Sequence, residues 1–334
     1  MKNLLKQLTE TFGPSGYEDE VRKLVQAEVK AIADEIKVDV LGNLIVHKKP
    51  TKESKESKKI MIAAHMDEIG LMVSHLDEKG FVRFSSLGGV FGKYIHGGRV
   101  RFLNGVQGVI GYDRFEKVHE APALNKIYID VGATSKKDCP VKVGDVAAFD
   151  RPFTELGNRL VAKSMDDRVG VLVAIETLRA LKASVHDVYF VFTTQEEVGS
   201  RGAGTSAYGI DPDLGIAVDV TSAADTPDAF KMEMVLGGGP CVKIKDSGSI
   251  ADPRVVQWMI RTAEKGKIPC QREVLLFGGT DADMIQRVRT GVPSGCLSIP
   301  TRYVHSPSEM VDYSDVQNSV KLLTALLRTP IDLG

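Results

Sequence analysis

The sequence predicts an α/β protein whose main domain is interrupted by a smaller β-rich domain. Helical and strand-like segments fill the chain up to about residue 68, and they alternate again after about residue 160. Between them lie short strand-like runs punctuated by glycines, which is typical of a small barrel or sandwich. A length of 334 residues suits roughly two domains. We therefore expect residues 1–68 and 160–334 to form one domain and residues 69–159 to form the insert.

The sequence up to residue 68 predicts two helices followed by two strands. Apolar residues recur at helical spacing over residues 4–33, and the breaker "GPSG" at 13–16 divides them. The apolar runs "DVLGNLIVHKK" (39–49) and "KIMIAAHMD" (59–67) resemble strands. The charged stretch "PTKESKESKK" (50–59) joins these strands, and we interpret it as an exposed hairpin tip.

The insert and the returning α/β segment follow in order. Five short β-like runs occupy the insert: "FVRFSSLGG", "GRVRFL", "GVQGVIGY", "NKIYIDVGA" and "GDVAAFD". The returning segment predicts strands at "VYFVFTT" (188–194), "LGIAVDV" (214–220) and "GCLSIPT" (295–301). It predicts helices at "DDRVGVLVAIETLRAL" (166–181), "DPRVVQWMIRTAEKG" (252–266) and "YSDVQNSVKLLTALLR" (313–328).

The composition is that of an ordinary soluble protein, with 43% apolar and 26% charged residues and a formal net charge of −1. This balance gives no electrostatic reason to expect nucleic acid or an anionic membrane as a partner. The N-terminus does not resemble a signal peptide, and no apolar run approaches about 18 residues. We expect a cytoplasmic protein whose four cysteines, none of them in a CxxC pair, are reduced and bind no zinc.

Polar residues gather where the predicted apolar strands end, or in the loops that follow. In open α/β sheets, ligands bind at this carboxyl edge. Taken alone, each cluster has a plain explanation, such as a helix N-cap for the paired aspartates. Together they offer a mixed nitrogen and oxygen ligand set that suits Zn²⁺, Co²⁺ or Mn²⁺, and enough ligands for two ions sharing a carboxylate. The clusters are His65 with Asp67, Asp166 with Asp167, Glu196 with Glu197, Asp219, and His305.

The adjacent pair Glu196 and Glu197 suggests a division of labour. One carboxylate binds a metal, and its neighbour takes a proton from a water whose pKa the metal lowers. Asp67 lies two residues after His65, so on an extended segment both side chains face the same way. We expect Asp67 to hold the far nitrogen of His65 and orient the ring.

Six ordered segments resemble the tetrahedral (TET) aminopeptidases, the glutamyl and deblocking group of co-catalytic metallopeptidases. The likeness spans nearly the whole chain. The segments are "AAHMDEIG" (63–70), "SMDDRVG" (164–170), "TTQEEVGSRGA" (193–203), "AVDV" (217–220), "FGGTDA" (277–282) and "TRYVHSP" (301–307).

The resemblance implies a role for each matching residue. His65, Asp166 and Asp219 resemble the ligands of one metal ion. Asp166, Glu197 and His305 resemble the ligands of the other, so that Asp166 bridges the two ions. Glu196 matches the general base and Asp67 the residue that orients His65. The choice of Asp166 over Asp167 rests on family members that carry Asn at the second position.

The resemblance also implies the fold and the activity. The fold would be a zinc-peptidase-like three-layer α/β/α domain with an inserted β-barrel or PDZ-like domain that drives dimerisation and helps build a twelve-subunit tetrahedron. The activity would be removal of N-terminal residues from short peptides through a water activated by two divalent ions, Zn²⁺ or Co²⁺ first and Mn²⁺ as an alternative. The preferred first residue stays open.

Two other functions are weighed against this one. Family members are often labelled endoglucanases, and a β-1,4-glucanase needs two carboxyl groups flanking a sugar bond. Adjacent residues at a strand end point apart, and aromatic residues total only 6% with a single Trp, which leaves little surface for stacking on a polysaccharide. The second alternative is a non-catalytic metal-bound assembly protein, whose signature would be loss of Glu196. Because Glu196 is present, the aminopeptidase is the preferred reading.

Overall fold

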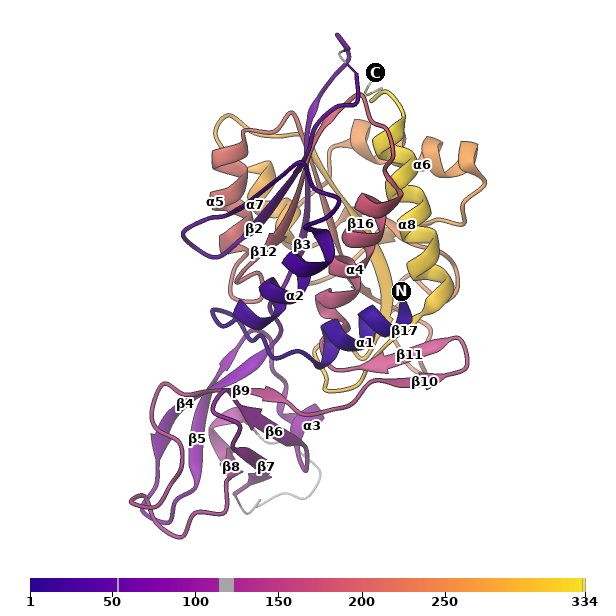
Figure 1. Cartoon of the computed structure of the whole chain (residues 1–334). Helices are drawn as coiled ribbons and strands as arrows, with labels where there is room; N and C mark the ends of the chain where they lie inside the picture. Colours follow the sequence, from indigo (N-terminus) through magenta and orange to yellow (C-terminus); the bar gives the residue numbers. More distant parts are fainter. Residues whose placement is uncertain (53, 114–122, 332, 334) are drawn as a thin grey trace.

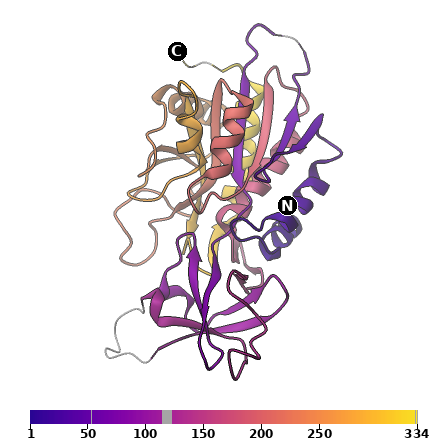
Figure 2. The ribbon, with the colours of Figure 1, turned by 90° about the vertical axis from the view of Figure 1, so that its left-hand side faces the viewer.

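The computed structural model describes residues 1–334 apart from 53, 114–122, 332 and 334. An α/β body forms the larger part of the molecule, and a β-barrel projects from one end of it (Figures 1 and 2). This architecture confirms the predicted α/β class with an inserted barrel. Among the described residues, no helix is long and apolar enough to cross a bilayer.

A mixed sheet of eleven strands runs through the body, and four neighbouring strands at its centre are parallel. These four are β12 (Asp187–Thr193), β3 (Lys59–His65), β13 (Leu214–Ser222) and β16 (Ser294–Arg302). Their sequences are nearly continuous apolar runs because both faces of the sheet are covered. The flanking strands are β1 (Glu35–Val38), β2 (Leu44–Lys48), β17 (Glu309–Asp312), β11 (Arg159–Ala162), β10 (Thr154–Leu156), β14 (Cys241–Lys245) and β15 (Gln271–Val274).

The predicted hairpin between the first two long strands is wrong. Strand β12 lies between β2 and β3, antiparallel to β2 and parallel to β3. The charged stretch 50–59 therefore carries the chain across β12 instead of closing a tight turn, and residue 53 lies outside the described part. Local sequence could not reveal this, because the strand that separates the two is contributed more than 120 residues later.

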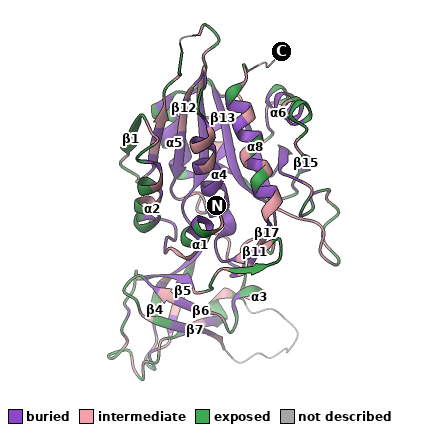
Figure 3. Cartoon of the chain, turned by 45° about the vertical axis from the view of Figure 1, so that its right-hand side comes forward, coloured by how far each residue is buried: buried purple, intermediate pink, exposed green. Residues whose placement is uncertain are grey.

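Helices cover both faces of the sheet, as the alternation of side chains on β3 shows. Ile60 and Ile62 pack in the larger apolar core, whereas Met61 and Ala63 pack in a smaller core on the opposite face. Figure 3 shows the buried strands between the helical layers. The larger core packs against α1 (Lys2–Glu10), α2 (Asp19–Val29), α4 (Met165–Ala180), α6 (Pro253–Gly266) and α8 (Tyr313–Arg328), and the smaller one against α5 (Arg201–Ile210) and α7 (Asp281–Gln286).

The barrel closes in the order β4-β5-β8-β7-β6-β9 and has an apolar core of its own. Closure leaves no open sheet edge, so this small unit is protected against pairing with other strands. Its last strand, β9, ends at Phe149, and the following strand β10 already pairs with β11 in the main sheet. The barrel elements are β4 (Gly70–Leu76), β5 (Val82–Leu87), α3 (Gly92–Ile95), β6 (Arg99–Phe102), β7 (Gln107–Tyr112), the 3₁₀ turn Leu124–Lys126, β8 (Ile127–Asp130) and β9 (Val146–Phe149).

Candidate active site

The predicted polar residues meet at one edge of the main sheet. His65 is the last residue of β3, and Asp219 lies near the end of β13. Glu196 and Glu197 follow β12, and His305 follows β16. Since β12, β3, β13 and β16 are parallel neighbours, their carboxyl ends bring residues far apart in sequence to one place. The fifth contribution comes from the start of α4, which packs across β3 and β13.

Asp166 lies between the two histidines. Its Oδ1 is 3.0 Å from His65 Nε2, and its Oδ2 is 3.4 Å from His305 Nε2. The carboxylate is almost fully buried, with 7% of the residue exposed. Burial raises the pKa of this carboxyl, but the two imidazoles lower it by more, so the net pKa lies below the ordinary range.

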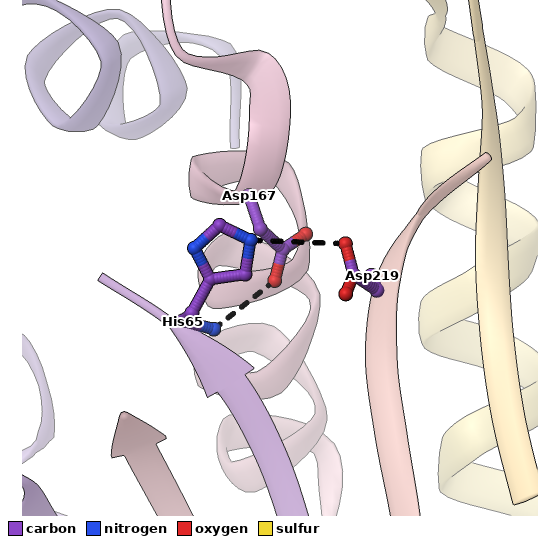
Figure 4. Close-up of side chains that lie close together, drawn as sticks. All are labelled: His65, Asp167 and Asp219. Atoms are coloured by element: carbon purple, nitrogen blue, oxygen red, sulfur yellow. Dashed lines mark hydrogen bonds and ion pairs between the residues drawn. The ribbon is translucent and has the colours of Figure 1, made fainter. Parts of the chain in front are cut away.

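Asp167 makes a different set of contacts, although it also lies close to His65 and Asp219 (Figure 4). Its Oδ2 accepts a hydrogen bond from the backbone N–H of His65 at 3.2 Å, and its Oδ1 accepts one from Gly170 N–H at 3.1 Å. Both carboxylate oxygens of Asp167 therefore already accept a hydrogen bond from a backbone N–H group. The proximity of ligand atoms alone groups His65 with Asp167 and Asp219, and groups Asp166 with Glu197 and His305.

The two glutamates face different partners. Glu197 Oε2 is 3.2 Å from His305 Nε2, while Glu196 Oε2 is 4.0 Å from His65 Nε2. Glu196 Oε1 accepts a hydrogen bond from Ser200 Oγ at 3.0 Å. Glu197 Oε1 is buried and has no hydrogen-bond partner among the described residues. Adjacent carboxylates thus point to the two sides of the cluster.

Asp67 contacts His65 as expected, but its main hydrogen bonds go elsewhere. His65 Nδ1 lies 3.1 Å from the backbone oxygen of Asp67 and 3.4 Å from its carboxylate. The carboxylate accepts the backbone N–H groups of Glu196 and Glu197 at 2.9 and 3.1 Å, and the Ser15 hydroxyl at 2.6 Å. Asp67 therefore also fixes the turn that carries both glutamates, which the sequence did not indicate.

Glu18 extends this support to a third consecutive amide. Its Oε1 accepts hydrogen bonds from Gln195 N–H at 3.1 Å and from Gly16 N–H at 2.7 Å. Gln195 itself has a left-handed backbone with φ of 57°, a conformation that a non-glycine residue rarely adopts. Two buried carboxylates, Glu18 and Asp67, thus hold the backbone from Gln195 to Glu197. Asp67 follows β3, whereas Glu18 lies directly after the "GPSG" segment, which in sequence looked only like a helix breaker.

We expect the stability contribution of Glu18 to depend on pH. Burial raises its pKa from 4.5 to about 7, and the neighbouring Asp67 carboxylate adds to the increase. Glu18 therefore keeps its proton up to about pH 7 in the folded protein, whereas the unfolded chain releases it near pH 4.5. As the pH rises through this window, ionisation of Glu18 lowers the free energy of unfolding by up to about 3 kcal/mol.

Glu18→Gln removes this titration. Urea unfolding of both proteins at pH 5 and pH 8 should show the variant gaining stability relative to wild type at the higher pH. A difference between the two proteins that is the same at both pH values would place the Glu18 pKa in its ordinary range.

The barrel contributes to the site through a double glycine after β5. A side chain at Gly89 would lie 2.4 Å from His305 Nδ1, and one at Gly88 would lie 2.8 Å from Glu197 Oε2. Gly89 and Phe91 line the cleft of about 660 Å³ that opens onto the cluster. The sequence presented these glycines only as turn residues. Their role could not be predicted, because no local sequence pattern shows that they lie beside His305.

The donor set fits divalent metal ions. The facing atoms are imidazole nitrogens and carboxylate oxygens, which Zn²⁺, Co²⁺ and Mn²⁺ accept. Burial raises the pKa of the Glu196, Glu197 and Asp219 carboxyls, and neighbouring carboxylates raise it further. So many acidic groups are stable together in the ionised form only with compensating positive charge. The unpaired oxygen of Glu197 is also explained if it faces a cation.

The barrel inserted into a three-layer α/β body, with this cluster at the sheet edge, defines an aminopeptidase of the TET type. The M42 glutamyl aminopeptidase model matches residues 42–322. The chain belongs to this family.

Individual relatives agree in fold and length. The chain is 39% identical to a lysyl aminopeptidase of Pyrococcus furiosus over 97% of this chain and 96% of the relative. An aminopeptidase of Desulfurococcus kamchatkensis matches with a TM-score of 0.92 and 44% identity, covering 98% of this chain and 94% of that one. The Pyrococcus horikoshii TET1 peptidase, which assembles into a tetrahedron or an octahedral shell, matches with a TM-score of 0.86 and 33% identity over 98% and 99% of the chains.

Proposed function

We propose that this aminopeptidase is metal-dependent and removes N-terminal residues from short peptides with two divalent ions per subunit. His65, Asp166 and Asp219 would hold one ion, and Asp166, Glu197 and His305 the other. The single observation that carries the proposal is Asp166, which turns one carboxylate oxygen toward each histidine. Zn²⁺ and Co²⁺ suit these donors best, with Mn²⁺ as the third candidate.

The reaction assigns a separate task to each residue near the cluster. When bound, the ions polarise the scissile carbonyl and lower the pKa of the attacking water. Glu196 accepts the proton of that water and returns one to the leaving amine. Asp67 holds the His65 ring and the Glu196–Glu197 backbone, so it positions both the ligands and the base. The cleft beside the cluster receives the peptide.

The functional test begins with chelation. The stripped protein should lose activity toward aminoacyl chromogenic substrates and regain it with Zn²⁺, Co²⁺ or Mn²⁺, while soluble cellulose releases no sugar under any condition. An N-terminally blocked peptide serves as the negative control. Activity that survives complete metal removal, or sugar release, would overturn the proposal.

The two aspartates at the start of α4 should respond differently to substitution. Asp166→Asn should lower the content of both ions, because the shared carboxylate is lost. Asp167→Asn should keep most of the metal, since Asp167 already accepts two backbone N–H groups and would lose mainly stability, on the order of 1–3 kcal/mol. Metal per chain, measured by plasma mass spectrometry after gel filtration, distinguishes them. The reverse order would make Asp167 the shared ligand.

We also propose residues 1–68 and 160–334 as the catalytic domain and residues 69–159 as a domain for dimerisation. The closed barrel, whose strands run from Gly70 to Phe149, supports a separate unit within this range. The tetrahedral and octahedral assemblies of the Pyrococcus horikoshii relative support self-association, including a dodecamer. Light scattering of the full chain with and without metal tests the assembly.

A further inference from the structure

A second hollow of about 720 Å³ continues from the catalytic cleft. The cleft of about 660 Å³ and this hollow share four wall residues, so the two hollows adjoin. One of the four, Phe91, stacks near His305 with ring centroids 6.3 Å apart. The shared residues are Phe91, Ser222, Phe277 and Val304. We call the part beyond them the aromatic groove.

The aromatic groove carries large side chains that are unusually exposed. Tyr94 is 42% exposed, Tyr303 is 48% exposed and Phe230 is 64% exposed. Phe230 also contacts Phe277, with ring centroids 5.5 Å apart. Contiguous exposed aromatic surface of this kind marks a binding site in soluble proteins.

Few charges line the aromatic groove. Apart from the tyrosines, its ionisable lining residues are one base, Lys93, and one acid, Asp228. The Lys93 ammonium lies 4.5 Å from the centre of the Tyr94 ring, so that part of its charge faces an aromatic surface. The catalytic cleft differs, because Asp283 and Arg287 form an ion pair in its wall. An apolar ligand is therefore matched better by the aromatic groove than by that part of the cleft wall.

A peptide that is cleaved at the cluster needs an open path leading away from it. In an aminopeptidase, the residue to be removed occupies the pocket at the reacting atoms, and the rest of the peptide must leave that pocket through an open side. The aromatic groove starts at Phe91 and Val304 beside His305 and runs away from the cluster. Aromatic side chains there offer contacts to apolar residues at low entropy cost.

We propose that the aromatic groove binds the substrate residues that follow the scissile bond and favours apolar or aromatic side chains among them. This rests on the proposed function, and it adds a substrate class: peptides of several residues with apolar side chains after the first. Single aminoacyl derivatives reach the catalytic cleft but leave the aromatic groove empty.

The test compares substrates that share their first residue. The first residue is the one best cleaved as a p-nitroanilide, and it is followed either by Phe-Phe or by Ala-Ala. In wild type, kcat/KM should be about tenfold higher for the Phe-Phe peptide. In the double variant Tyr94→Ser/Phe230→Ser, the ratio of kcat/KM between the Phe-Phe peptide and the p-nitroanilide should fall about tenfold. Tyr208→Ser is the matched control, since Tyr208 is 62% exposed on α5 and lines neither hollow.

A binding measurement separates failure of the groove from failure of the catalytic assignment. Fluorescence anisotropy of labelled Phe-Phe and Ala-Ala peptides on the Glu196→Gln protein reports the aromatic groove without turnover. The proposal is supported if this protein binds the Phe-Phe peptide more tightly than the Ala-Ala peptide and loses that preference when Tyr94→Ser/Phe230→Ser is combined with Glu196→Gln. This holds even if wild type cleaves neither peptide. Equal binding of both peptides overturns it. A change of particle mass in the double variant with unchanged peptide preference also overturns it, because a second copy of the chain would then cover the groove.

Discussion

Glu196→Gln should lower kcat by about 10²- to 10⁴-fold while leaving the metal content of the protein unchanged. The substitution keeps the size of the side chain and leaves an oxygen that can accept the Ser200 hydroxyl, so the local structure persists. It removes the group that accepts the proton of the attacking water. The measurement is kcat and KM at saturating metal, with metal per chain determined on the same sample.

Glu197→Gln is the matched substitution one residue away, and it should behave differently. Glu197 faces His305 and carries the buried oxygen without a hydrogen-bond partner among the described residues, so its loss should weaken one metal ion. Added metal should then restore part of the activity of Glu197→Gln and none of that of Glu196→Gln. Near-full activity of Glu196→Gln at saturating metal would show that another residue is the base.

The sequence predicted those parts of the site that local pattern encodes. Apolar runs identified the parallel strands, and the polar residues at their ends identified His65, Asp219 and His305 as neighbours. The rule that ligands gather at the carboxyl ends of parallel strands brought His65 and Asp219, which are far apart in the chain, to within 3.8 Å of each other. The i, i+2 spacing predicted Asp67 beside His65, and its carboxylate lies 3.4 Å from His65 Nδ1.

The parts that sequence missed depend on the path of the backbone through space. The amides that Asp67 and Glu18 hold belong to a turn more than 120 residues away, and no periodicity encodes that approach. The same holds for Gly89, which allows the barrel to lie against His305. The erroneous hairpin has a related cause, since two strands adjacent in sequence need not be adjacent in a sheet.

A buried ion pair beside the point where the chain leaves the α/β body should be highly sensitive to loss of one charge. Lys163 and Glu68 lie there, 4% and 1% exposed, with Lys163 Nζ 2.6 and 2.8 Å from the two carboxylate oxygens. Lys163→Met leaves the Glu68 carboxylate buried without its main partner. We expect a loss of about 3–5 kcal/mol in the free energy of unfolding, toward the lower end because Arg168 lies 3.5 Å from Glu68.

Urea unfolding followed by the fluorescence of Trp258, the single tryptophan, measures this loss in the core of the α/β body. Lys2→Met is the control, because the Lys2–Glu155 pair is partly exposed and should contribute less than about 1 kcal/mol. The double variant Lys163→Met/Glu68→Gln should recover part of the stability, since a neutral side chain is easier to bury than an unpaired charge. If the double variant is instead less stable than Lys163→Met, the carboxylate is held by Arg168 and Gly13 alone and the Lys163 pair is not what stabilises the junction.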